Sequence, residues 1–237
     1  MQIIHHPANS RGTVNMGWLQ SKHSFSFGSW YSPDKIHFGA LRVLNDDTVL
    51  GGQGFPKHPH DNMEIVSIPL RGALAHSDST GNSGIIKAGD VQIMSAGSGI
   101  THAEFNASKT EPVHFLQIWV FPKVDNIKPR YDQKYFDPAG RENSWQIVVS
   151  PREDDGGLWI NQDAFFSLTK ISAKTELPYK LHNEGNGIYL FLLEGSIDVD
   201  GRVLNKRDAI GITDANEFSV NALADSEVLA IEVPMLK

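Results

Sequence analysis

Short apolar runs, separated by turns rich in glycine, proline, asparagine and aspartate, dominate this chain. The clearest runs are ALRVLNDD, EIVSIPLRG, DVQIMSAGSG, VHFLQIWVFP, SWQIVVSP, FFSLTKIS, GIYLFLLEGSIDVDG and EVLAIEVP. Runs of this length with turn residues at both ends are typical of strands, and the 3.6-residue period of amphipathic helices is scarce. The pattern therefore predicts an all-β protein.

One of these runs predicts a strand that is covered on both faces. In residues 113–120, the set Val113, Phe115, Gln117 and Trp119 alternates with the set His114, Leu116, Ile118 and Val120. Both sets are largely apolar, whereas a strand with one face in water alternates apolar with polar residues. We expect an interior strand of a sandwich or barrel.

An internal repeat divides the chain. EIVSIPLRGALAHSDSTGN is echoed by GIYLFLLEGSIDVDG, and AGDVQIMSAG is echoed by KRDAIGITDA. Two copies of one β unit predict a tandem pair of small double-stranded β-barrels. Residues 121–143, rich in proline, charge and turn residues, are the best candidate linker, and their aromatic residues indicate that they pack against a domain. We expect domains at 1–138 and 139–237.

Composition excludes several classes of function. The formal charge of −7 over 237 residues argues against nucleic acid or an anionic membrane surface as a partner. No run approaches the ~18 apolar residues that cross a bilayer, and MQIIHHPANSRG lacks the features of a secretory signal. The absence of cysteine excludes disulfides and thiol chemistry. We expect a cytoplasmic monomer.

Two segments carry candidate metal ligands. The segment FPKHPHDNME offers His58 and His60, followed by Glu64, and the segment GSGITHAEFN offers His102 and Glu104. Positions i and i+2 of a strand point to the same face, so each segment presents a pair of donors. Four such side chains on inward β faces are costly to bury without an ion. The sequence therefore predicts a metal site between the two segments.

The backbone around these pairs is suited to a fixed site. Pro59 holds His58 in the extended region and removes a ladder donor, so the first segment is stiff before an ion arrives. Gly97 and Gly99 permit a sharp turn into the second segment. Glu64 is four residues from His60, which by strand alternation is the same face, so spacing does not decide between the two glutamates as a ligand.

Imidazole and carboxylate ligands suit Fe(II), Mn(II), Co(II), Ni(II), Cu(II) and Zn(II). The absence of thiolate ligands argues against a closed structural zinc site. Four protein ligands on a six-coordinate ion leave two positions for water, substrate or dioxygen. The donor set therefore indicates an open site of the catalytic type.

The two segments resemble the cupin motif pair. The first motif matches Gly52, His58, His60 and Glu64, with its closing glycine, Gly72, one residue late, and the second matches Gly99, His102 and Asn106, with Gly97 in place of the usual proline. The order of WLQSKHSFSFGSWYSP, FGALRVLNDD, GQGFPKHPHDNMEIV, LRGALAHSDSTGN, AGDVQIMSAGSGITHAEFN and LQIWVFP more closely resembles the pirin family, over most of residues 12–122. Residues 145–237 resemble the pirin C-terminal cupin only weakly.

The resemblance implies a bicupin, with two tandem double-stranded β-helix (jelly-roll) barrels. It implies that the metal ligands are His58, His60, His102 and Glu104, and it leaves Glu64 as a hydrogen-bonding or half-buried residue. It also implies one ion per chain, with Fe(II) preferred among the metals named above.

Bacterial pirin-like proteins show quercetin 2,3-dioxygenase activity, so the resemblance implies the same activity for this chain. In that reaction a flavonol and dioxygen react, the central ring opens and carbon monoxide leaves. Glu104 would be the catalytic base that accepts the proton of the flavonol 3-hydroxyl, and Phe25, Phe27, Trp30 or Phe55 would line the cleft. The alternative is a metal- or redox-dependent regulatory protein with a protein partner and incidental flavonol activity. An isomerase or hydrolase is least favoured, because no second acid–base pair accompanies the site.

The second copy of the repeat lacks the ligand set. KLHNEGNGIYLF keeps His182 and Glu184 but has no His-x-His, and GITDANEFSV has no histidine. We expect a C-terminal domain without metal. The ordinary surface or core role is expected for His5, His6, His23, His37, His76 and His182. His114 is expected to be a satisfied buried histidine, or else to donate to Glu104.

Overall fold

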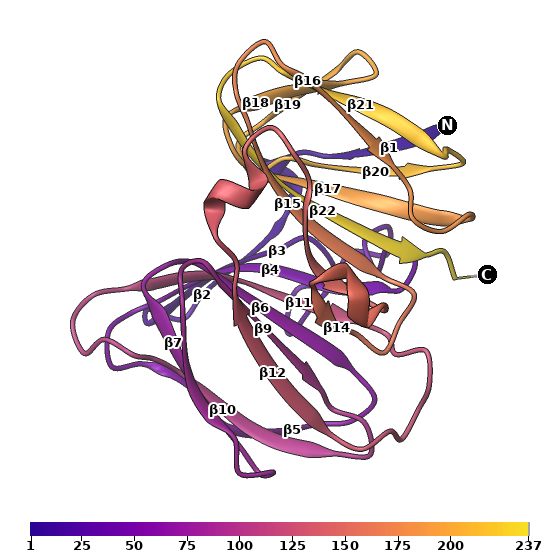
Figure 1. Cartoon of the computed structure of the whole chain (residues 1–237). Coiled ribbons are helices and arrows are strands. Elements are labelled where there is room, and N and C mark those ends of the chain that lie inside the picture. Colours follow the sequence, from indigo (N-terminus) through magenta and orange to yellow (C-terminus); the bar gives the residue numbers. More distant parts are fainter. Residues whose placement is uncertain (237) are drawn as a thin grey trace.

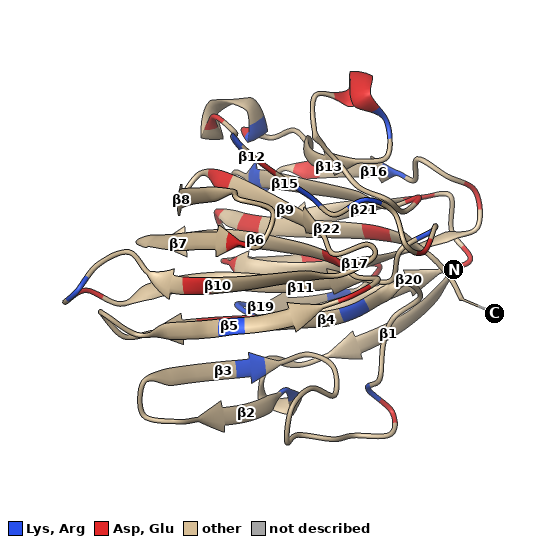
Figure 2. Ribbon diagram, turned by 90° about the horizontal axis from the view of Figure 1, so that it is seen from below, with Lys and Arg blue, Asp and Glu red and all other residues tan. Residues whose placement is uncertain are grey.

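The computed structural model describes residues 1–236 and consists of strands with three short 3-10 helices, Ala8–Ser10 (η1), Pro138–Arg141 (η2) and Glu153–Asp155 (η3). The strands form two halves, which lie one above the other in Figure 1. The absence of α-helix from the described residues agrees with the all-β prediction, and no helix in this range has the length and hydropathy to cross a membrane. Basic and acidic residues are interspersed over both halves (Figure 2).

The N-terminal barrel consists of a seven-stranded and a four-stranded antiparallel sheet. The large sheet has the order β12 (Arg130–Tyr135), β9 (Asp90–Ser95), β6 (Glu64–Arg71), β11 (Val113–Val120), β4 (Leu41–Val49), β3 (Leu19–His23) and β2 (Gly12–Asn15). The small sheet has the order β5 (Gly54–His60), β10 (Ile100–Asn106), β7 (Ala73–Asp78) and β8 (Ser83–Lys87). Strand β12 lies inside the expected linker 121–143, so that segment is partly an edge strand.

The C-terminal barrel repeats this plan. Its large sheet has the order β1 (Gln2–His6), β20 (Ala209–Thr213), β17 (Asn186–Glu194), β22 (Ser226–Pro234), β15 (Phe165–Ile171), β13 (Gln146–Ser150) and β14 (Leu158–Trp159). Its small sheet has the order β16 (Glu176–Lys180), β21 (Glu217–Ala222), β18 (Ser196–Val199) and β19 (Arg202–Asn205). The first strand of the chain thus completes a sheet of the C-terminal barrel, and it is the indigo strand beside β20 in Figure 1. The division at 138/139 stays a prediction.

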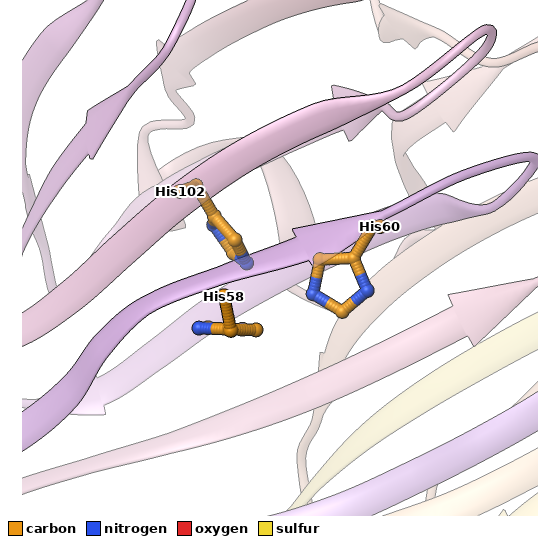
Figure 3. A group of neighbouring side chains, drawn as sticks. All are labelled: His58, His60 and His102. Carbon is orange, nitrogen blue, oxygen red and sulfur yellow. The ribbon is translucent and has the colours of Figure 1, made fainter.

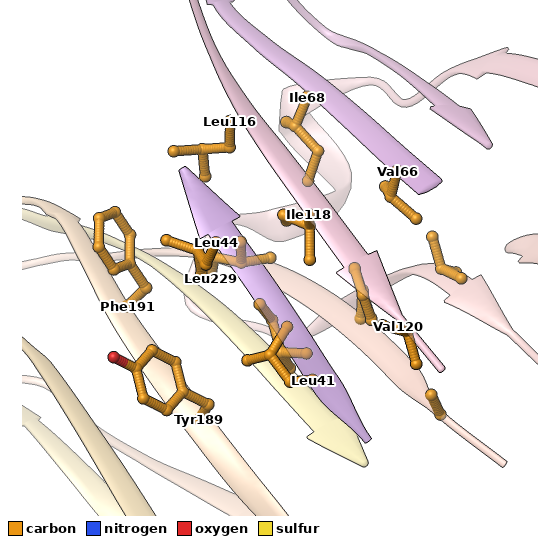
Figure 4. Close-up of a cluster of buried hydrophobic side chains, with 14 of the residues drawn as sticks. Leu41, Leu44, Val66, Ile68, Leu116, Ile118, Val120, Tyr189, Phe191 and Leu229 are labelled. Atoms are coloured by element: carbon orange, nitrogen blue, oxygen red, sulfur yellow. The ribbon is translucent and has the colours of Figure 1, made fainter. Parts of the chain in front are cut away.

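The two large sheets pack against each other through their outer faces. One apolar cluster spans both barrels, and Figure 4 shows part of it. In strand β11, Leu116, Ile118 and Val120 belong to this cluster, while Gln117 and Trp119 alternate with them and face the barrel interior. Both faces of β11 are therefore covered, which confirms the prediction for residues 113–120.

A buried ionic cluster lies beside this apolar interface. Asp46 accepts a hydrogen bond from Arg11 (3.1 Å) and bonds to the His114 ring, and the Arg207 side chain of the C-terminal barrel approaches to 3.7 Å. Burial raises the pKa of Asp46, but the His114 bond and the two arginines outweigh it and lower the pKa to about 2. His114 is satisfied by Asp46, as predicted, and it lies on the outer side of the sheet, so the alternative of a donor to Glu104 is wrong.

We predict that Leu229→Ala lowers the free energy of unfolding of the whole chain by ~2–5 kcal/mol, because it opens a cavity between the two sheets. Leu229 has no exposed surface and lies in the shared cluster. The measurement is urea unfolding. The matched control is Leu223→Ala, at a leucine that is 52% exposed, where a change within ~0.5 kcal/mol is expected. Equal effects at both positions would contradict this account of the interface.

Candidate metal centre

Three histidines gather where β5 pairs with β10. His58 and His102 are directly opposite each other in the register, with ring centroids 4.4 Å apart. His60 lies 4.9 Å from each of them, centroid to centroid. One nitrogen of each ring lies within 4.8 Å of the others, so the three side chains could hold an ion (Figure 3). The structure thus brings together the histidines of the two predicted segments.

The local backbone explains this placement. Strand β5 is the edge strand of the small sheet. Pro59 has no backbone N–H, and an edge strand tolerates proline because one of its sides has no partner strand to bond. Gly97 and Gly99 have φ of 48° and 128° in the turn before β10, as expected. A Cβ at Gly97 would lie 2.1 Å from the Ile127 carbonyl oxygen, so this turn requires glycine.

The histidines are held in a state that suits metal binding. The Nδ1 of His58 lies 2.8 Å from the Pro56 carbonyl oxygen, so Nδ1 donates and Nε2 is free to act as a ligand. His102 is buried and neither of its ring nitrogens has a hydrogen-bond partner. Burial, together with the charge of His58, lowers the pKa of His60 to about 4 and that of His102 to about 3. These two rings are neutral at physiological pH, as metal ligands must be.

Glu104 follows His102 on β10, after a register shift against β5. It is fully buried, and its two oxygens accept hydrogen bonds from the Ser67 hydroxyl (3.1 Å) and the Gln117 amide (2.7 Å). Burial raises the pKa of Glu104 above its ordinary value. A carboxylate oxygen of Glu104 lies within 4.8 Å of nitrogens of His76 and His102.

His76 is a site residue that the sequence reasoning missed. It lies opposite Glu104 on β7, and Asp78 lies opposite His102. Its Nε2 bonds to Asp78 at 3.1 Å, and its ring stacks on Tyr131 at 4.5 Å. The polar i, i+2 pair His76 and Asp78 on an alternating strand was a usable signal, but only the strand register shows that it faces Glu104.

Glu64 does not share a face with His60, so the expectation from simple alternation is wrong. Strand β5 ends at His60, and a turn with Asn62 at φ 44° leads into β6, which belongs to the other sheet. Glu64 points toward the C-terminal barrel. It accepts hydrogen bonds from the Ser95 hydroxyl (2.8 Å) and from the backbone N–H of Asn161 (3.1 Å).

A cavity of about 360 Å³ opens beside the histidines. Its aromatic walls are Phe27, Phe55 and Trp119, and His58, His60 and Glu104 also line it. The expectations for Phe27 and Phe55 are therefore met. Phe25 instead lies in the core between the barrels, and Trp30 packs against Gly12.

A polar row crosses the interior wall of the large sheet. Asn45, Gln117, Ser67 and Gln92 are paired neighbours on β4, β11, β6 and β9, and all are buried. Asp47, two residues after Asn45, lines the cavity on the same face. Burial raises the pKa of Asp47 to about 7. The Ser21 hydroxyl, directly across on β3, opposes this, while the nearby carboxylates of Asp46 and Glu104 add to it. The sequence reasoning did not single out these residues.

In the second half, the histidine of the degenerate motif has a different role. His182 bonds through Nδ1 to the buried Glu232 at 2.8 Å, and its ring stacks on Phe165 at 4.2 Å. Glu232 also accepts hydrogen bonds from the backbone N–H groups of His182 and Asn183 and from the Asn186 side-chain amide. The hydrogen-bond partners of Glu232 are thus protein groups, and they join β22 to the segment before β17 and to the first residue of β17.

Comparison with known proteins identifies both halves. The family model described as Pirin matches residues 5–120, and the model described as Quercetinase C-terminal cupin domain matches residues 147–233. The predicted bicupin fold is thereby confirmed, including the C-terminal cupin that the sequence resembled only weakly.

Full-length relatives agree with this. A quercetin 2,3-dioxygenase of Escherichia coli K12 is 40% identical over 227 residues, 96% of each chain, and a pirin-like protein of Caulobacter vibrioides is 40% identical over 227 residues, 95% of this chain and 97% of its own. The crystal structure of a bacterial pirin from E. coli in complex with nickel(II) superposes with a TM-score of 0.94 at 38% identity, covering 99% of this chain and 100% of the other. With the histidine cluster in its first barrel and a cupin in its second, the chain belongs to the pirin family.

Proposed function

We propose that this chain is a metal-dependent dioxygenase that cleaves flavonols, of the quercetin 2,3-dioxygenase type. The observation that carries the proposal is a cluster of three histidines beside an aromatic cavity, which two of them, His58 and His60, line together with the buried Glu104. The name of the E. coli relative supports the choice of substrate.

The proposed ligands are His58, His60, His102 and Glu104. The unpartnered ring nitrogens of the buried His102 fit a bound ion, because burying them without a partner is costly. Three imidazoles and a carboxylate suit a divalent transition metal. Fe(II) remains our preferred ion, and the nickel(II) complex of the E. coli pirin shows that a relative accepts another metal of the same series.

When bound, the ion would act as a Lewis acid that lowers the pKa of the flavonol 3-hydroxyl. Side chains of the protein bind the substrate, exclude water and accept the proton. Phe27, Phe55 and Trp119 hold the planar rings and exclude water. Glu104 accepts the hydroxyl proton, for which its raised pKa suits it, and hydrogen bonds from Ser67 and Gln117 fix its orientation.

We predict one ion per chain in wild type and loss of most of it in His58→Ala, His60→Ala and His102→Ala, because each variant removes one of the proposed donors. The measurement is elemental analysis of protein purified without chelator, with circular dichroism to show that the fold is retained. The control is His5→Ala, at a partly exposed histidine beside Asp208. Full occupancy in His102→Ala would remove the proposed site.

We predict that Glu104→Gln lowers flavonol-dependent oxygen uptake by ~10²–10⁴-fold, because the neutral amide is a poorer ligand and no base. Glu64→Gln should keep the metal and most of the rate, since Glu64 points away from the histidines toward Asn161. Both variants are measured side by side for metal content and oxygen uptake. The assignment fails if Glu64→Gln strips the metal while Glu104→Gln behaves like wild type. Absence of turnover in wild type, with a tight protein partner, would favour a regulatory role.

We predict that the metal-free wild type loses more stability than metal-free His102→Gln as the pH falls below about 6.5. In the unfolded chain histidines titrate near their ordinary pKa, whereas the pKa of His102 in the folded chain is about 3. At this residue the unfolded state therefore binds more protons in this window, so His102 makes the free energy of unfolding decrease with acid. The raised pKa values of Asp47 and Glu104 act in the opposite sense, but they do so in both proteins. Urea unfolding of chelator-treated protein between about pH 7 and about pH 5 measures the slope. On acidification the free energy of unfolding of wild type should fall further than that of His102→Gln, and equal changes in the two proteins would contradict the burial argument.

A further inference from the structure

We propose that Asn45 and Asp47 on β4 recognise ring hydroxyl groups of the substrate, so that the cavity selects polyhydroxylated aromatic molecules over analogues that lack those hydroxyls. The substrate class rests on the proposed function, but the recognition itself is a property of the cavity wall. Both residues line the same cavity as His58 and His60.

Two buried acceptors on the cavity wall carry this proposal. Asn45 is 2% exposed and Asp47 is 4% exposed, and the Oδ1 atom of each has no hydrogen-bond partner among the described residues. Leaving a buried acceptor unpaired destabilises a fold, so such groups in a native structure call for an explanation. A ligand that supplies donors at the wall of this cavity provides one.

Unpaired buried atoms also occur nearby, at Gln92 Oε1 in the polar row and at Ser21 Oγ across from Asp47, but these two residues do not line the cavity. Asp46, on the opposite face of β4, is satisfied by Arg11 and His114. Gln117, beside Asn45 in the polar row, donates to Glu104, and its Oε1 lies 3.0 Å from the Ser67 hydroxyl oxygen. Asn45 and Asp47 thus combine a covered, unpaired acceptor with a place on the cavity wall, and rotation of the side chain would bring that acceptor to a substrate.

The chemistry of the wall specifies the ligand. The aromatic side chains of Phe27, Phe55 and Trp119 favour a planar apolar body. At a pH above the Asp47 pKa of about 7, its carboxylate and the Asn45 amide carbonyl both accept hydrogen bonds, so the partner must donate. A phenolic hydroxyl donates, whereas a bare ring carbon or a methyl ether does not. A site built to bond a hydroxyl discriminates strongly against the analogue without it, because the buried acceptors are left unpaired.

The test compares the affinities of quercetin and 3-hydroxyflavone without dioxygen. Both molecules carry the 3-hydroxyl, so their contact with the ion is shared and only the other hydroxyls differ. Metal-loaded wild type should bind quercetin about 10- to 100-fold more tightly, as expected for hydrogen bonds to charged or buried groups. Asp47→Leu and Asn45→Leu should each remove much of that preference. Thr48→Val, on the outer face of β4 beside His114, is the control and should keep it.

A second measurement separates recognition from a structural role. Replacing an unpaired buried acceptor by a similar apolar side chain should leave the urea midpoint unchanged or raise it. A clear fall in the midpoint of both leucine variants would overturn the proposal. Asp47→Asn keeps the shape and an acceptor, so it should fold and keep most of the preference, and its loss of the preference would also overturn the proposal. An unchanged preference in both leucine variants would overturn it outright. Oxygen uptake is scored separately, because absent turnover with preserved preference contradicts the dioxygenase proposal and leaves the recognition intact.

Discussion

The packing of the two large sheets against each other is the interaction on which the site depends. Leu116, Ile118 and Val120 of β11 meet Phe191 and Leu229 of the C-terminal barrel in one cluster (Figure 4). Because alternate residues of a strand point to opposite faces, this outer contact fixes which residues point inward. Burial of the outer face also supplies apolar stabilisation, which lets the inner face carry a row of polar residues. The C-terminal cupin therefore contributes to the site without contributing a residue to its histidine cluster.

The candidate metal centre joins the two sheets of the N-terminal barrel. The histidines belong to the small sheet, while Ser67 and Gln117, which hold Glu104, belong to the large sheet. The distance between the sheets thus sets the position of the carboxylate relative to the imidazoles. Asn161 of the C-terminal half bonds to Glu64 at the start of β6, which links the other barrel to this same sheet. Substitutions at the interface can therefore act on the site through the position of β6 and β11.

Local patterns were sufficient for the strands and for the two histidine pairs. The two apolar faces of residues 113–120 and the His-x-His spacing each need only the period of a strand. Features that depend on the pairing of distant strands were not accessible. His76 faces Glu104 through the β7–β10 register. The strand Gln2–His6 pairs with β20, which lies more than 200 residues further along the chain. Glu64 was placed on the wrong face because one left-handed residue, Asn62, ends the alternation.

Asp46 and Asp47 are neighbours on β4 whose side chains point to opposite faces of the sheet, one toward a structural contact and the other toward the cavity. Asp46 points outward, where Arg11 and Arg207 stabilise its charge, and its pKa falls to about 2. Asp47 points inward, where burial raises its pKa to about 7 and one of its oxygens has no donor. Two identical neighbours thus have opposite electrostatics, because they face different environments. The first is compensated by the fold itself. The unpaired oxygen of Asp47 lowers the stability of the fold. The fold tolerates this because packing on both sides of the sheet holds β4 in place, and a substrate hydroxyl is the group that would offset the loss.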